Sequence, residues 1–155
     1  MPADLESRLR SQGIELPKHP DAPKANYMPY VRVHDLLYVS GQLSAGAEGL
    51  ITGKLGLDVD TDAGVFAARC CAVSLLAQVK AACEGDLDRL VRVVKLVGFV
   101  NSTPDFTEQS IVINGASDLL AQALGAAGRH ARSAVSVAAL PFGAAVEIEG
   151  IFAIR

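Results

Sequence analysis

The sequence predicts an α+β fold, a two-layer sandwich in which two helices pack on one face of a mixed β-sheet. One observation behind this class is the order of the segments, which runs strand, strand, helix, strand, helix, strand, strand. A second is that both helical segments are apolar enough to cover one face of such a sheet. The third is the length, because 155 residues fit one domain, residues 1–155, with a substantial core.

Residues 1–29 are predicted to form a short helix and an extended arm. Leu5 and Leu9 lie four positions apart among charged residues, which indicates an amphipathic helix over residues 3–12. Four prolines between residues 17 and 29 then disfavour helix and keep the chain extended. Two short strands follow, residues 31–35 and 36–40, before a glycine-rich loop that reaches residue 60 and is long enough to be functional.

The middle of the chain alternates helix and strand. Asp60, Thr61 and Asp62 offer N-cap chemistry for a helix over residues 63–83. The β-branched run 90–100 predicts a long strand, and the segment 102–105, with a proline and an acid, predicts the start of a helix that ends near residue 123. Two strands, residues 133–140 and 145–154, complete the fold around a turn at Pro141 and Gly143.

Composition argues against several classes of partner. The net charge is −3 and no Lys/Arg cluster stands out, so nucleic acid is an unfavourable partner. The first residues lack the apolar core of a signal peptide, and no apolar span of 18 residues is free of charge. We therefore expect a cytoplasmic protein with no membrane partner.

The three cysteines, Cys70, Cys71 and Cys83, lie in one alanine-rich helical segment. They lack the spacing and the histidine companions of a zinc site. We expect buried, reduced side chains and no metal site.

Charges on the last two strands are the most informative functional feature. Arg132 precedes an apolar strand, and Glu147 and Glu149 share one face of the next strand. A charge beside a core needs either a structural partner or a ligand. Both faces of the last strand are too apolar for simple solvation, which favours a homo-oligomer.

The motifs that carry a family resemblance span residue 30 to the C-terminus. They are Pro29-Tyr-Val, Ser40-Gly-Gln-Leu43, Gly85-Asp-Leu, the run 94–100, Ala131-Arg-Ser-Ala-Val135, Leu140-Pro141 and Val146-Glu-Ile-Glu149. In this order and spacing the chain resembles the RidA/YjgF-like reactive intermediate deaminase family, also labelled the L-PSP endoribonuclease or translation inhibitor family. The resemblance implies a chorismate-mutase-like fold, assembled as a homotrimer with ligand clefts between subunits.

The resemblance also implies roles for individual residues. Arg132 matches the arginine that binds a substrate carboxylate, and Glu147 matches the acid that positions the attacking water. The remaining matches to the ligand pocket are Tyr30, Ser40, Gly41, Asn114 and Ala134. Ala134 stands where many members have a cysteine, and its main chain, or that near Gly41, would help to orient the carboxylate.

The implied reaction is hydrolysis of a small enamine or imine acid, such as 2-aminoacrylate, to a 2-keto acid and ammonia, without metal or organic cofactor. Two alternatives are a non-catalytic protein that binds a carboxylate ligand in the same pocket and an RNA-cleaving translation inhibitor. Structural explanations also remain: Arg132 in a salt bridge, Glu147 as a solvated ion-pair partner, Ser40 and Gly41 as a turn. His130 is assigned no catalytic role because a lone histidine in a glycine-rich loop is more often a surface or packing residue.

Strand geometry constrains how Arg132 and Glu147 meet. If residues 133–140 and 145–154 form a hairpin, Arg132 lies opposite about residue 153 and Glu147 is ~20 Å away along the strand. Either the two strands are not direct neighbours, or the two side chains of one site come from different subunits. We favour the second explanation.

Overall fold

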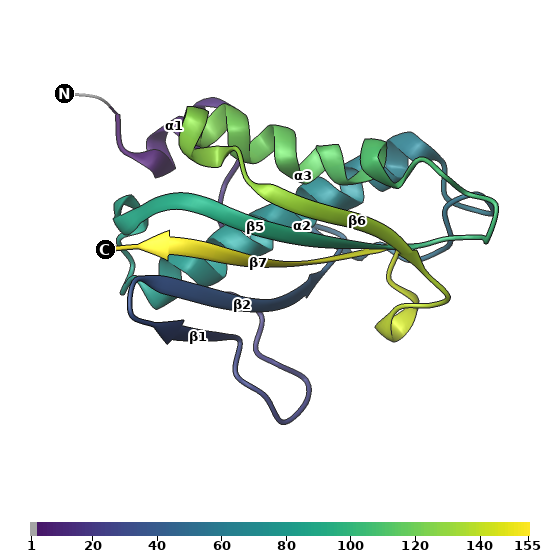
Figure 1. Cartoon of the computed structure of the whole chain (residues 1–155), viewed down its shortest axis with the longest axis horizontal. Helices are drawn as coiled ribbons and strands as arrows, with labels where there is room; N and C mark the ends of the chain where they lie inside the picture. Colours follow the sequence, from purple (N-terminus) through teal and green to yellow (C-terminus); the bar gives the residue numbers. More distant parts are fainter. Residues whose placement is uncertain (1–2) are drawn as a thin grey trace.

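The computed structural model describes residues 3–155, so residues 1 and 2 of the predicted N-terminal arm lie outside the described residues. Two long helices cover one face of a five-stranded sheet (Figure 1), which confirms the predicted α+β class. The elements are α1 (Leu5–Ser11), β1 (Tyr30–Val33), β2 (Leu36–Leu43), β3 (Ala45–Gly46), β4 (Gly49–Leu50), α2 (Thr61–Ala82), η1 (Leu87–Arg89), β5 (Leu90–Asn101), α3 (Gln109–Leu124), η2 (Gly125–Gly128), β6 (Ala131–Val137), η3 (Pro141–Gly143) and β7 (Val146–Ile154).

The sheet is mixed, with strand order β1-β2-β7-β5-β6. Its one parallel pair is β5 with β6, and the other pairs are antiparallel. The hairpin considered for the last two strands is therefore wrong, because β5 lies between β6 and β7 (Figure 1). The physical reason is α3, which connects β5 to β6 as the crossover that a parallel pair requires.

The core lies between the sheet and the two long helices. Asp60 caps α2 by accepting a hydrogen bond from the Ala63 N–H at 2.8 Å, as the N-cap residues predicted. Fully buried side chains of α2 and α3 belong to one core cluster with sheet residues such as Leu96 and Phe152. Gly115 of α3 lies against the main-chain carbonyl of Val65 in α2, so the two helices approach more closely than a side chain would allow.

Helix α2 is long and apolar enough to pass for a membrane span by length and composition alone. In the folded chain 56% of its most apolar window is buried, as in the core helix of a sandwich. The three cysteines of this segment are free and buried, as predicted. Burial raises the pKa of all three thiols, which disfavours the reactive thiolate.

The second long helix begins later than predicted, at Gln109. Pro104 and Asp105 form a turn, because the preceding residues pair with the long loop after β2: Ser102 forms a β-bridge with Leu55, and Thr103 N–H donates to the Leu55 carbonyl at 3.0 Å. Tertiary pairing thus overrides the local helix-start signal.

The N-terminal helix and arm cross the helical layer. Leu5 and Leu9 of α1 are buried, which confirms the amphipathic pattern. Gln78 of α2 donates from its side-chain amide to the carbonyl of Asp21 in the arm at 3.1 Å. The loop between β2 and α2 is held as well, since the Lys54 ammonium donates to Asn101 Oδ1 at 2.6 Å and to the carbonyl of Ala138.

The face of the sheet opposite the helices keeps apolar side chains in solvent. By strand register Val31, Val33, Tyr38 and Val135 share this face, and each is 45–51% exposed. We name these four residues the open-face patch. Val31, Val33 and Tyr38 lie together on β1 and β2, and Val135 lies on the opposite edge strand. Exposed apolar side chains on one sheet face indicate a site of interaction rather than of simple solvation.

The close contact between α2 and α3 predicts that a larger side chain at position 115 destabilises the protein. A Cβ at position 115 meets main chain, which cannot swing aside, so Gly115→Ala should cost about 2 kcal/mol despite alanine's better helix propensity. Denaturant titration checks it, with the exposed Asp118→Ala on the same helix as a control that changes stability by less than about 0.5 kcal/mol. Equal midpoints for Gly115→Ala and the parent would contradict this account of helix packing.

Candidate functional site

Arg132 lies on edge strand β6 under helix α3. Strand register pairs it with the fully buried Leu96 of β5, so its side chain is on the helix-covered side of the sheet. The guanidinium Nη1 donates to Asn114 Oδ1 at 2.8 Å and to Ser117 Oγ at 3.0 Å, and Nη2 donates to the Ser110 carbonyl at 3.1 Å. The three partners recur along one face of α3, where positions 110, 114 and 117 are neighbours.

These contacts leave part of the guanidinium free for a ligand. Arginine has five N–H donors, and the three hydrogen bonds within residues 3–155 use both on Nη1 and one on Nη2. The Nε–H and the second Nη2–H remain. The three ion pairs within the same residues involve other side chains, so Arg132 is held by neutral oxygens and keeps its positive charge uncompensated. An internal salt bridge therefore does not explain this residue.

Asn114 is thus a direct partner of Arg132, and Ser117 is a partner that sequence reasoning missed. The sequence carries a pattern that indicates Ser117: Ser110, Asn114 and Ser117 form a polar stripe at helical spacing in an otherwise apolar segment. Ser117 also contacts His130, with its Oγ 3.0 Å from the ring Nε2. His130 is half-buried, and burial together with the nearby Arg132 lowers its pKa.

Ala134 follows Arg132 on the same side of β6, opposite Gly98 of β5. It is half-buried and contacts the core cluster. The position two residues after the arginine thus carries a methyl group, and its polar atoms are those of the main chain.

Glu147 lies on β7, on the sheet face opposite the helices. Its carboxylate covers Gly41, where a Cβ would clash with Glu147 Oε1. Strand β2 changes register between Val39 and Gln42, and this bulge places the glycine under the carboxylate. Burial, and after it the neighbouring Glu149, raise the pKa of Glu147 above the ordinary 4.5.

The other two predicted pocket residues lie on the neighbouring strands β1 and β2. Ser40 donates from Oγ to the Met28 carbonyl at 2.7 Å and from its N–H to the Pro29 carbonyl at 2.9 Å. Its hydroxyl proton therefore fastens the segment before β1 to β2, and Ser40 and Gly41 lie within β2 rather than in the turn that the structural explanation proposed. Tyr30, at the start of β1, is half-buried and rests against the core.

The predicted residues therefore form two groups. The carboxylate half-site is Arg132, Asn114, Ser117 and Ala134, and the acid half-site is Glu147, Gly41, Ser40 and Tyr30. Within one chain they do not meet. Arg132 is opposite Leu96 of the intervening β5, and Glu147 is opposite Phe99 of the same strand. The Cα atoms of Arg132 and Glu147 are therefore about 14 Å apart, and their side chains are on opposite faces of the sheet.

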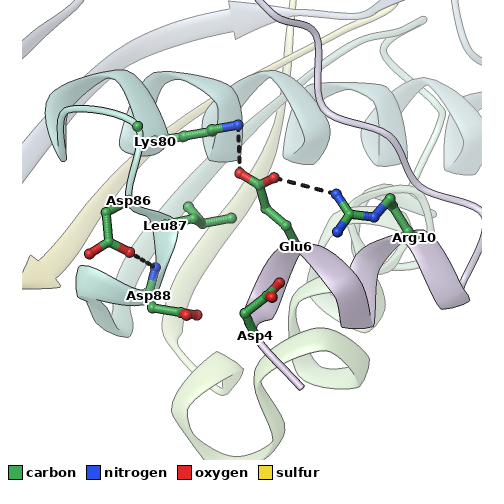
Figure 2. A pocket seen from close by; sticks show the side chains of 8 residues that line it. Asp4, Glu6, Arg10, Lys80, Asp86, Leu87 and Asp88 are labelled. Atoms are coloured by element: carbon green, nitrogen blue, oxygen red, sulfur yellow. Dashed lines mark hydrogen bonds and ion pairs between the residues drawn. The ribbon is translucent and has the colours of Figure 1, made fainter. Parts of the chain in front are cut away.

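A separate hollow lies between α1, the end of α2 and η1 (Figure 2). Glu6 fills its middle and pairs with Lys80 at 2.6 Å and with Arg10 at 3.5 Å. The main-chain N–H of Leu5 donates to Asp88 Oδ1 at 2.9 Å. These contacts fasten α1 to the body of the protein, and we assign the hollow a structural role. Among residues 3–155 no cluster of three His, Cys, Asp or Glu side chains could hold a metal ion.

Comparison with known proteins agrees with the motifs. The family model described as "YjgF/chorismate_mutase-like, putative endoribonuclease" matches residues 6–153. Protein TCP17 of Trypanosoma cruzi is 52% identical over 149 residues, which cover 95% of this chain and 92% of TCP17.

Solved structures give the same result. Atu1372 of Agrobacterium tumefaciens, a protein of unknown function, is 51% identical with a TM-score of 0.90, covering 97% of this chain and 92% of that one. A "putative endoribonuclease" of Shewanella oneidensis MR-1 is 33% identical with a TM-score of 0.92, covering 98% and 100%. TdcF of Escherichia coli, solved with bound serine, shares the fold at 23% identity and a TM-score of 0.61, covering 92% and 97%.

The environment of Glu147 predicts a pH-dependent stability effect. A raised pKa means that ionising this carboxyl opposes folding, so stability is lost as the pH rises through the pKa of the folded state. Glu147→Gln should stabilise the protein at about pH 8, by less than about 1 kcal/mol because solvent screens a half-exposed group. The gain should vanish below about pH 4, where the carboxyl is protonated in both states.

Thermal melts of parent and variant across this pH range test the effect, with Glu48→Gln on an exposed turn as the matched substitution. A Glu147→Gln protein that is less stable than the parent at alkaline pH would show that the carboxylate is favourably paired.

Proposed function

The chain belongs to the YjgF/chorismate mutase-like family, to which RidA belongs, and from this premise we propose that it is a hydrolytic deaminase of small reactive enamine or imine acids such as 2-aminoacrylate. The observation that carries the proposal is the state of Arg132. Its guanidinium is fixed by three oxygens, lacks a carboxylate partner within residues 3–155, and keeps two N–H donors free. A planar donor pair of this kind suits a ligand carboxylate.

The proposed reaction depends on holding the substrate and a water molecule in place. Arg132 would bind the carboxylate of the 2-imino acid, and the main chain at Ala134 would help to orient it. Glu147 would accept a hydrogen bond from water as the water oxygen adds to the imine carbon. The imine nitrogen takes up the proton that the water loses, which gives a tetrahedral adduct with a hydroxyl and an amino group. The hydroxyl proton then passes to the nitrogen as the C–N bond breaks and the C=O bond forms, so that a 2-keto acid and ammonia leave. The raised pKa of Glu147 brings this carboxylate closer to the strength of a useful general base.

The separation of the two half-sites supports a shared site. We propose a closed homotrimer in which the carboxylate half-site of one subunit meets the acid half-site of the next. Glu147 of the acid half-site and the open-face patch lie on the same sheet face, while Arg132 lies at the β6 edge. If the β6 edge of one subunit docked on the open face of another, Arg132 of the first would lie near Glu147 of the second. Cyclic symmetry would then repeat this cleft three times.

One assay distinguishes this proposal from its alternatives: release of keto acid from 2-aminoacrylate generated in situ, with and without the protein. Faster release supports the deaminase. Saturable binding of a small carboxylate without faster release would instead indicate a binding protein, consistent with the serine bound to TdcF. RNA cleavage by rigorously purified protein would favour the RNA-cleaving translation inhibitor. The net charge of −3 does not favour that alternative.

Arg132→Ala should abolish turnover while the fold persists, because losing a charged hydrogen-bond anchor costs about 2–5 kcal/mol. Arg132→Lys should recover little activity, since an ammonium lacks the bidentate fork. The matched control is Arg129→Ala, which removes an exposed arginine three residues away and should leave turnover unchanged. Parent-like rates in purified Arg132→Ala would remove this residue from the site.

The trimer makes its own prediction. Tyr38→Asp places a charge in the open-face patch, so light scattering should report a smaller species without loss of secondary structure. Phe66→Asp alters an apolar side chain that is 57% exposed on the helical layer and should leave the assembly intact. A parent protein that scatters as a monomer at micromolar concentration would refute the trimer.

Subunit mixing tests whether the site is shared. Arg132→Ala and Glu147→Ala should each be inactive, and a random 1:1 mixture should regenerate about one quarter of the clefts, those that take Arg132 and Glu147 from different parents. Verified mixed trimers that remain inactive would show that each site belongs to one subunit.

A further inference from the structure

A chain of hydrogen bonds runs from Arg132 away from its free donors. Arg132 Nη1 lies 3.0 Å from Ser117 Oγ, Ser117 Oγ lies 3.0 Å from His130 Nε2, and His130 Nδ1 lies 2.7 Å from the Gly128 carbonyl oxygen. The deaminase chemistry proposed above uses neither Ser117 nor His130 directly.

The partners fix the direction of every bond in this chain. A carbonyl oxygen can only accept, so His130 Nδ1 carries a proton and donates it to Gly128. Burial lowers the pKa of His130, and in the neutral ring that this favours Nε2 is an acceptor. The Ser117 hydroxyl must then donate to Nε2, which leaves its oxygen lone pairs for the Arg132 guanidinium.

We propose that Ser117 and His130 are positioning residues for Arg132: His130 orients the Ser117 hydroxyl, and Ser117 locks the guanidinium so that its Nε–H and Nη2–H face the ligand carboxylate. The identity of that ligand rests on the proposed function, whereas the hydrogen-bonded chain itself is independent of it.

Arg132 Nη1 donates to two side chains, Asn114 and Ser117, and both hydrogen bonds are needed to fix the guanidinium. Without Ser117 the guanidinium would keep two hydrogen bonds, to Asn114 and to the Ser110 carbonyl, and both of these residues are exposed, whereas Ser117 is half-buried. Without an acceptor at His130 Nε2, the Ser117 hydroxyl could rotate and point its proton at the cationic guanidinium. Ser117 would then repel Arg132 instead of accepting from it.

The segment before β6 is built to hold the histidine. Gly128 ends η2 directly against α3, where a Cβ would clash with the carbonyl oxygen of Leu120. This contact fixes the Gly128 carbonyl and with it the Nδ1 end of His130, while Ser117, less than one turn before Leu120 on the same helix, meets the other end. Helix α3 thus sets both ends of the ring.

The first test needs no ligand. In the parent protein, long-range ¹H–¹⁵N correlation of the His130 ring should show the Nδ1–H tautomer, and the side-chain N–H protons of Arg132 should exchange slowly with solvent. His130→Leu and Ser117→Ala should accelerate that exchange at least severalfold, because a hydrogen-bonded anchor is lost. An Nε2–H tautomer, or unchanged exchange in both variants, would overturn the proposal.

The second test measures binding of pyruvate, a stable 2-keto acid, by equilibrium titration, and KM and kcat for imine hydrolysis. Ser117→Ala and His130→Leu should weaken pyruvate binding about five- to tenfold, in the range expected for a lost hydrogen bond near a charged group, and should raise KM more than they lower kcat. Ser117→Thr keeps the hydroxyl and His130→Gln keeps an acceptor near Nε2, so both should retain most of the affinity. Ser74→Ala on α2 is the matched control.

The outcomes separate the two proposals. If Arg132→Ala abolishes pyruvate binding while Ser117→Ala and His130→Leu bind like the parent, the positioning role is wrong and the deaminase proposal stands. If the parent neither binds pyruvate nor turns over imine, the deaminase proposal fails, and the tautomer and exchange data alone decide whether Ser117 and His130 hold Arg132.

Discussion

The parallel pairing of β6 with β5 is the constraint on which the rest of the site depends. A parallel pair needs a crossover connection, and α3 is that connection. The same helix then lies over the strand that it leads to, so its polar stripe stands above Arg132. A hairpin between the last two strands would have placed no helix there and would have left the guanidinium in solvent.

This topology also determines what one chain can do. With β5 between them, Arg132 faces the helical layer and Glu147 faces the open side of the sheet. Each charge is accommodated by its local surroundings. Arg132 lies at a sheet edge and donates to three oxygens, and Glu147 lies above a glycine in a bulged strand. Neither arrangement completes a site for a small acid by itself, which is why assembly is central to the proposed function.

Sequence reasoning succeeded where the signal was local or lay in ordered motifs. The Asp60 cap and the apolar run predicted α2 to within two residues, and the motifs identified the family. Reasoning failed where tertiary contacts decide. Strand order depends on pairing across the sheet, so the β6–β5 neighbourhood was not visible from alternation, and the start of α3 moved because residues before it pair with Leu55. The recurrence of Ser110, Asn114 and Ser117 could have indicated the helix face over Arg132, but only once β6 was placed beneath it.

Two features beside Arg132 take on a physical meaning together. Ala134 brings no reactive side chain to the position after Arg132, so this edge of the site can orient a carboxylate but cannot supply a nucleophile from that position. The segment from Gly125 to Ala131 holds a histidine whose two nitrogens are both occupied by structural partners. For an intermediate that already hydrolyses spontaneously, orientation is the main contribution a protein needs to make. Both features therefore fit the proposed site, in which the chemistry depends on how firmly Arg132 is held.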